Sequence, residues 1–183
     1  MKKAFSTLAC PTLSLEELLS LAERKGMDAV EIRLDCKNRL CEYLPSEMGE
    51  AKRILDHSTV GISNLATGIS FAGEKSQASL TEQCSQMAAF LGVPALRVFA
   101  GNFVDFPVEI PEEKMMATAA SLDESAEIAA RYGVELWLET HSEYSTGASV
   151  AKGLPHLTRP KKPVEKRKKL RISSKPENET VIG

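Results

Sequence analysis

The sequence predicts an α/β protein built as an incomplete (β/α)8 barrel of about five βα units. Short apolar runs alternate with amphipathic segments along residues 1–151, which indicates a parallel sheet with helical crossovers. Polar residues lie at the ends of several apolar runs, and barrels build their sites from many strand ends. No glycine-rich phosphate-binding motif follows any predicted strand, which argues against an open nucleotide-binding sheet.

Local signals define the elements. Ser14 with Glu17, and Ser79 with Glu82, have the spacing of capping boxes before the first and third helices. A glycine closes the first, third and fourth helices, at Gly26, Gly92 and Gly133. We expect strands near 4–9, 28–34, 59–65, 95–100 and 134–139, and helices near 15–25, 47–56, 80–91 and 113–132.

Composition fits one cytoplasmic globular domain. With 43% hydrophobic and 26% charged residues, the chain can bury a core, and no apolar run is long enough for a transmembrane helix. The N-terminal apolar run is broken by Ser6 and Thr7, so we interpret it as a strand rather than a signal peptide. The cysteine spacing lacks a C-x-x-C pair, which favours reduced thiols over a zinc site.

The charge is divided unevenly. Residues 1–151 carry a net charge of −9, whereas residues 152–183 carry +7 and several prolines. We therefore expect a domain over 1–151 and a disordered basic tail over 152–183. The acidic domain and the absence of aromatics among the tail's basic residues argue against nucleic-acid binding. Open sheet edges of an incomplete barrel could pair in a homo-oligomer.

The stretch 134–141 carries the strongest chemical signal. It has the pattern of a buried strand ending in Glu139, with His141 two residues later. Residues i and i+2 of a strand point to the same face, at the end where parallel α/β proteins place their chemistry. Glu139 is thus a candidate functional carboxylate, or a solvated one at a strand end. His141 is a candidate substrate-facing group, or a hydrogen-bonded residue at the rim.

Four more polar residues in predicted strands are candidate substrate-binding groups. Glu31 and Arg33 share one strand face, where they could line a pocket or pair with each other. Asn64 could contact a substrate or make a turn hydrogen bond. Arg97, within an apolar strand, could contact a substrate or hold a carboxylate such as Glu31.

Four segments of the chain, 5–17, 26–33, 91–101 and 138–147, resemble in this order segments of the sugar phosphate isomerase/epimerase family, the xylose isomerase-like TIM barrels. The resemblance covers about residues 4–151. It implies a (β/α)8 barrel with a divalent metal (Mn, Mg or Zn) and a small-molecule sugar or sugar phosphate as substrate. It also implies that Glu139 is the first metal-binding carboxylate and an acid/base group, with His141 beside the substrate. The family's other ligands come from the sixth to eighth strands, for which this sequence has no counterpart.

The expected activity is metal-assisted proton transfer next to a carbonyl, weak or lost through truncation. One alternative is a metal-dependent abasic-site endonuclease-like barrel, although such proteins need more histidines at the strand ends. A second alternative is a non-enzymatic truncated product whose open sheet edges need a partner.

Overall fold

The protein has a five-stranded, wholly parallel sheet. The computed structural model describes residues 2–34, 47–71, 76–101 and 110–139. Its strands follow the order β1-β2-β3-β4-β5, each parallel to the next, as the predicted run of βα units requires. The strands are β1 Ala4–Ser6, β2 Ala29–Arg33, β3 Gly61–Ser70, β4 Ala95–Phe99 and β5 Glu135–Glu139.

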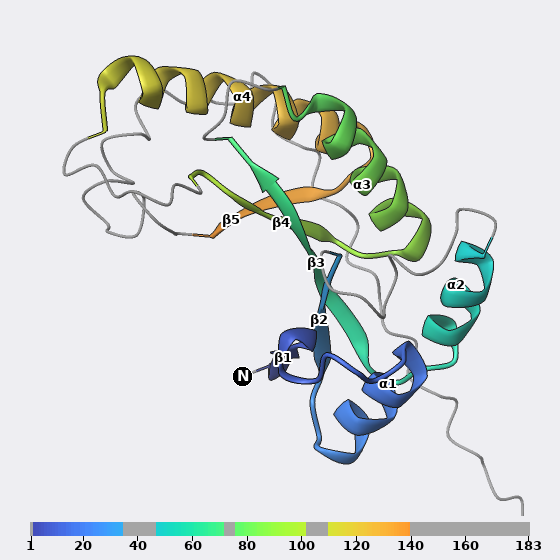
Figure 1. Cartoon of the computed structure of the whole chain (residues 1–183). Helices are drawn as coiled ribbons and strands as arrows, with labels where there is room; N and C mark the ends of the chain where they lie inside the picture. The colour runs from blue at the N-terminus through green and yellow to red at the C-terminus, as the bar shows by residue number, and fades with distance from the viewer. Residues whose placement is uncertain (1, 35–46, 72–75, 102–109, 140–183) are drawn as a thin grey trace, which may run out of the picture.

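The α-helices of the described residues lie along one face of this twisted sheet (Figure 1). They are α1 Leu15–Arg24, α2 Met48–Asp56, α3 Ala78–Leu91 and α4 Glu112–Arg131. In the described ranges, no helix combines the length and the apolar character needed to cross a bilayer. The arrangement confirms a partial (β/α)8 barrel. The tail over 152–183 lies outside the described residues.

Two strands differ in length from the prediction. The first ends at Ser6 rather than near residue 9, because the Ser6 hydroxyl accepts from the backbone N–H of Leu8 and caps a short 3-10 turn, η1 Thr7–Ala9. The third continues to Ser70 rather than stopping near 65. Its pairing with β4 is irregular after Ala66 and resumes at Ser70, opposite Phe99. Leu65 and Ile69 keep the alternation, but Thr67 and Gly68 between them weaken the apolar pattern by which a strand is recognised.

The two predicted capping boxes have different outcomes. At α1 the box is present: the Ser14 hydroxyl accepts from the N–H of Glu17, and the Glu17 carboxylate accepts from the N–H of Ser14. At α3 the prediction was wrong. This helix begins at Ala78, after Gln77, so Ser79 lies inside the first turn rather than at the cap.

Replacing Ser14 by alanine is expected to lower the free energy of unfolding by about 1 kcal/mol, because the N–H of Glu17 loses its acceptor. Urea unfolding followed by circular dichroism measures the loss. Ser79→Ala is the matched control and should stay within about 0.5 kcal/mol of wild type, since Ser79 caps nothing. Equal losses in both variants would contradict the assignment of the cap.

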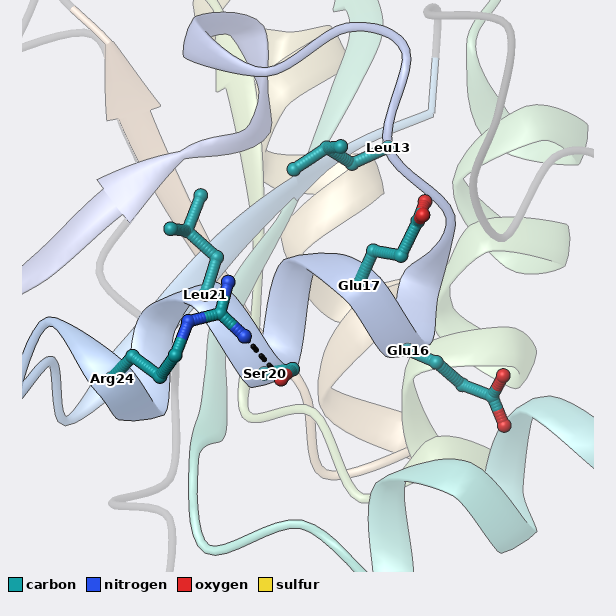
Figure 2. A pocket seen from close by; sticks show the side chains of 6 residues that line it. All are labelled: Leu13, Glu16, Glu17, Ser20, Leu21 and Arg24. Atoms are coloured by element: carbon teal, nitrogen blue, oxygen red, sulfur yellow. Dashed lines mark hydrogen bonds between the residues drawn. The ribbon is translucent and has the colours of Figure 1, made fainter.

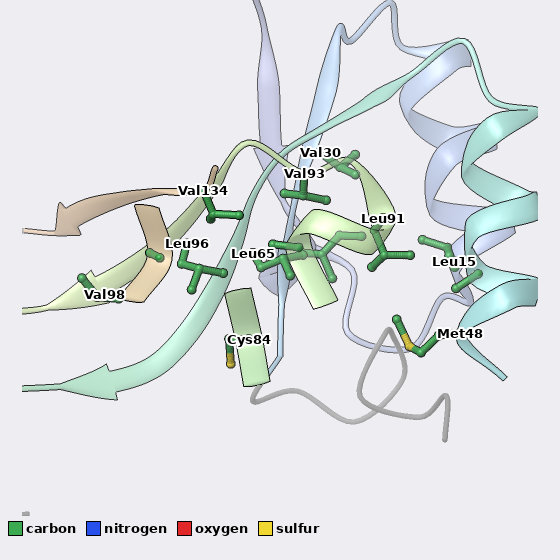
Figure 3. Packing of buried hydrophobic residues seen from close by; sticks show 14 of the residues in the cluster. Leu15, Val30, Met48, Leu65, Cys84, Leu91, Val93, Leu96, Val98 and Val134 are labelled. Carbon is green, nitrogen blue, oxygen red and sulfur yellow. The ribbon is translucent and has the colours of Figure 1, made fainter. Parts of the chain in front are cut away.

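The core lies between the sheet and the helices. Alternate strand residues point into it, including Val30, Leu65 and Leu96, which are fully buried. Helix residues such as Cys84 of α3 pack against them (Figure 3). Because successive strand residues point to opposite faces, the remaining residues of every strand point away from the helices. We call this side of the sheet the inner face.

Candidate functional site

The inner face carries five of the six residues that the sequence singled out. On β2, Glu31 and Arg33 alternate with the buried core residues Val30 and Ile32. Register partners across a parallel sheet share a face, and these partners extend the inner face across β3, β4 and β5. The candidate residues placed there are Glu31, Arg33, Asn64, Arg97 and Glu139. The sixth candidate, His141, lies outside the described residues.

Glu31 and Asn64 form one polar pair. Asn64 Nδ2 donates to Glu31 Oε2 over 2.9 Å, and the Ser63 hydroxyl donates to Asn64 Oδ1 over 2.8 Å. Ser63 is the extra residue at a register shift between β2 and β3. Because β3 is longer than expected, Asn64 lies within the strand and not at its end. Its amide binds a carboxylate instead of closing a turn.

Arg97 and Glu139 form a second pair. Arg97 Nε and Glu139 Oε2 are 3.0 Å apart, with the Arg97 side chain only 9% exposed and that of Glu139 43% exposed. The buried Nε–H is nevertheless misaligned for a hydrogen bond, so charge attraction accounts for the contact. The structure therefore gives Arg97 a carboxylate partner, although that partner is Glu139 and not Glu31.

The sequence did not predict two of the groups that contact Arg97. Nη1 of Arg97 donates to the Thr67 carbonyl over 3.3 Å, and its guanidinium carbon lies 4.3 Å from the centroid of the Phe99 ring. The i, i+2 spacing of Arg97 and Phe99 is a signal that could have found the ring contact. The Thr67 contact joins β3 to β4 where the pairing of these strands is irregular, and no local sequence pattern predicts it.

Glu31 and Glu139, the two carboxylates among the candidates, lie too far apart to bind the same divalent ion. A row of register partners crosses the sheet from Arg33 on β2 to Trp137 on β5. On β2, Glu31 lies two residues before Arg33, and on β5, Glu139 lies two residues after Trp137, so the two glutamates lie on opposite sides of this row. At about 4.8 Å per strand and 3.3 Å per residue, the Cα atoms of the two glutamates lie roughly 15–20 Å apart. One ion cannot bind both.

Oxygen-coordinated cations need several donors around them. Within the described parts of the chain, no group of three or more histidine, cysteine, aspartate or glutamate side chains could hold a metal ion. The carboxylate at the end of β5 fits one ligand position, and the described residues do not complete the expected site.

An open pocket lies elsewhere, along α1 (Figure 2). Three of its four polar side chains already have roles in the helix: Glu17 belongs to the capping box, and Arg24 Nη1 donates to the Ser20 hydroxyl over 2.8 Å. The pocket does not include the inner-face candidates. Its lining residues are Leu13, Glu16, Glu17, Ser20, Leu21 and Arg24.

The sequence profile of the xylose isomerase-like TIM barrel family matches residues 19–158. Among curated protein sequences, none matches the chain. Solved structures do. The probable 3-DHS dehydratase AsbF of Bacillus anthracis superimposes with a TM-score of 0.73 at 18% identity, over 87% of this chain and 60% of that one.

Two other solved structures show the same fold. An IOLI protein with a bound zinc atom superimposes with a TM-score of 0.69 at 20% identity, over 87% of this chain and 60% of that one. D-psicose 3-epimerase from Clostridium cellulolyticum H10, solved with D-tagatose, superimposes with a TM-score of 0.65 at 14% identity, over 84% of this chain and 60% of that one. This chain thus spans about 60% of the length of these proteins.

Proposed function

This chain belongs to the xylose isomerase-like TIM barrel family, and we propose that its inner face carries a sugar isomerase or epimerase type of site. The observation that supports this most is the position of Glu139. It is the last residue of β5, half exposed, and a buried arginine holds it. In (β/α)8 barrels, catalytic groups come from this end of the strands.

Glu139 is the proposed acid/base group. A carboxylate there can take a proton from the carbon next to a carbonyl and return it, a contribution typically of about 10²–10⁴-fold. A divalent ion held by Glu139, together with ligands outside the described residues, would stabilise negative charge on the substrate oxygens.

The proposed substrate is a small sugar or sugar phosphate. The Glu31–Asn64 pair offers hydroxyl partners, since the pair uses only Oε2 of Glu31 in its hydrogen bond. Arg33 places positive charge on the same face, which favours an anionic substrate group, whereas the charge of Arg97 is already paired with Glu139. His141, two residues beyond Glu139, is the proposed neighbour of the reacting carbon.

The chain's single tryptophan provides a test of Glu139. Trp137 lies on the inner face two residues before Glu139, and its side chain is 43% exposed. Co²⁺ bound at Glu139 should quench Trp137 fluorescence saturably, because energy transfer from indole to Co²⁺ acts at short range. Glu139→Gln should abolish both this quenching and any deuterium uptake from D₂O into a ketose, measured by mass spectrometry.

Glu135→Gln is the matched control. Glu135 lies on the same face, two residues to the other side of Trp137, and its Oε2 accepts from the indole Nε1 over 3.0 Å. This variant should keep the Co²⁺ response. Equal loss in both variants would mean diffuse attraction to an acidic strand. No response in wild type would leave a non-enzymatic protein as the better description.

A further inference from the structure

Arg97 has unusual surroundings for a charged residue. It occupies the middle of β4 between the fully buried Leu96 and Val98, and its own side chain is 9% exposed. A buried charge is costly unless partners compensate it. The guanidinium must therefore have specific compensating contacts, and the role of Arg97 can be inferred from them.

Three adjacent strands hold the guanidinium. From β3, the Thr67 carbonyl accepts from Nη1, and the Thr67 hydroxyl donates to the Arg97 carbonyl over 2.8 Å. From β4 itself, the Phe99 ring lies against the guanidinium at 4.3 Å. From β5, Glu139 Oε2 lies 3.0 Å from Nε. Two of these partners are in place without Glu139.

The pair is asymmetric. Arg97 is buried and fixed by two strands, whereas Glu139 ends its strand with 43% of its side chain exposed. The contact joins Nε of Arg97 to Oε2 of Glu139. The arginine thus restricts the carboxylate, which stays partly exposed at the end of its strand.

We propose that Arg97 is a positioning residue: it holds the Glu139 carboxylate in place on the inner face of the sheet, ready for a cation or a proton. Arg97 acts through Glu139 and does not itself touch the ligand. The relevance to chemistry rests on the proposed function above. The positioning can be measured without any ligand.

The first test is the rotamer of Glu139. In protein labelled with ¹³C-glutamate, the Glu139 carboxyl resonance is the one that Glu139→Gln removes. Its three-bond carbon–carbon coupling about χ2 should report one rotamer in wild type and averaged rotamers in Arg97→Met. Arg97→Lys keeps the charge but loses the planar fork, so an intermediate value is expected. Wild-type couplings in Arg97→Met would overturn the proposal.

The second test is the affinity for Mn²⁺, followed by the electron paramagnetic resonance of the free ion. Loss of a residue that orients a metal ligand typically weakens binding by about 10–100-fold. Arg97→Met should therefore bind Mn²⁺ more weakly, although a positive charge has been removed from the site. Tighter binding would show that Arg97 only repels the cation, and would overturn the positioning role.

Controls separate this role from a structural one. Arg53→Met removes an arginine from an exposed ion pair with Glu50 on α2, and should leave both measurements unchanged. Phe99→Leu removes the ring but no charge, and should loosen Glu139 partly, which provides a second variant if Arg97→Met fails to fold. If wild type binds no Mn²⁺ at all, the metal part of the proposed function fails, while the rotamer measurement still decides the role of Arg97.

Discussion

Replacing Leu65 with alanine is expected to lower the free energy of unfolding by about 2–5 kcal/mol. Leu65 is fully buried in β3, and its register partners Ile32 on β2 and Leu96 on β4 are fully buried as well. The truncated side chain would leave a cavity at the centre of this row, because three strands and the helices over them cannot close around it. The free energy of unfolding of a native domain is about 5–15 kcal/mol in total, so the variant loses a large share of its stability.

Urea unfolding with matched m-values measures this loss. Leu80→Ala is the control, since Leu80 on α3 is 44% exposed and its truncation should cost less than about 1 kcal/mol. A Leu65→Ala loss as small as that of the control would mean that β3 is not the centre of the core. A secondary effect follows from the alternation: Asn64, adjacent in sequence, should lose its fixed contact with Glu31.

The parts of the fold that the sequence predicts well are those with local causes. The start of α1 depends on Ser14 and Glu17, three residues apart, and its end on Gly26, whose φ of +64° lies in the left-handed region that glycine adopts at little cost. Strand β2 follows from the alternation of Val30 and Ile32 with polar residues. Each signal lies within one element, so no knowledge of the tertiary structure is needed.

The errors have causes that lie between elements. The length of β3 was missed because Thr67 and Gly68 weaken its apolar pattern, while the pairing with β4 at Ser70 cannot be read from the residues of β3 alone. The start of α3 was misplaced because Ser79 with Glu82 has the right spacing but the helix already begins at Ala78. A capping pattern is necessary for the box and not sufficient, since the preceding backbone must leave the helix at that residue.

The candidate site shows the same division. The polar residues at the ends of the predicted strands were expected to build one site, and the register of the sheet places Glu31, Arg97 and Glu139 on one face. Which carboxylate meets Arg97 was not predictable, because Glu139 is 42 residues away and the choice depends on the register of β4 against β5. The pairing with Glu139 makes Arg97 part of the strand-end site, which a pairing with Glu31 would not have done.

The stability of the protein is expected to fall above pH 9 in a way that depends on Cys84. This thiol lies on α3 with 7% exposure in the hydrophobic core, and burial raises its pKa from 9.0 to about 11. The folded state therefore keeps the proton after the unfolded chain has lost it. The contribution of the neutral thiol to the free energy of unfolding is fully present below pH 9. It falls by roughly 2–3 kcal/mol between pH 9 and 11.

The measurement is the difference in unfolding free energy between wild type and Cys84→Ala, from urea unfolding at pH 7 to 10.5 under reducing conditions. Lysines and tyrosines also titrate in this range, but they contribute equally to both proteins and cancel. Alanine removes packing by a constant amount, so wild type should lose its advantage only as the pH rises past 9. A difference that stays constant up to pH 10.5 would show that Cys84 titrates normally, and therefore that water reaches the face of α3 which packs on β3 and β4.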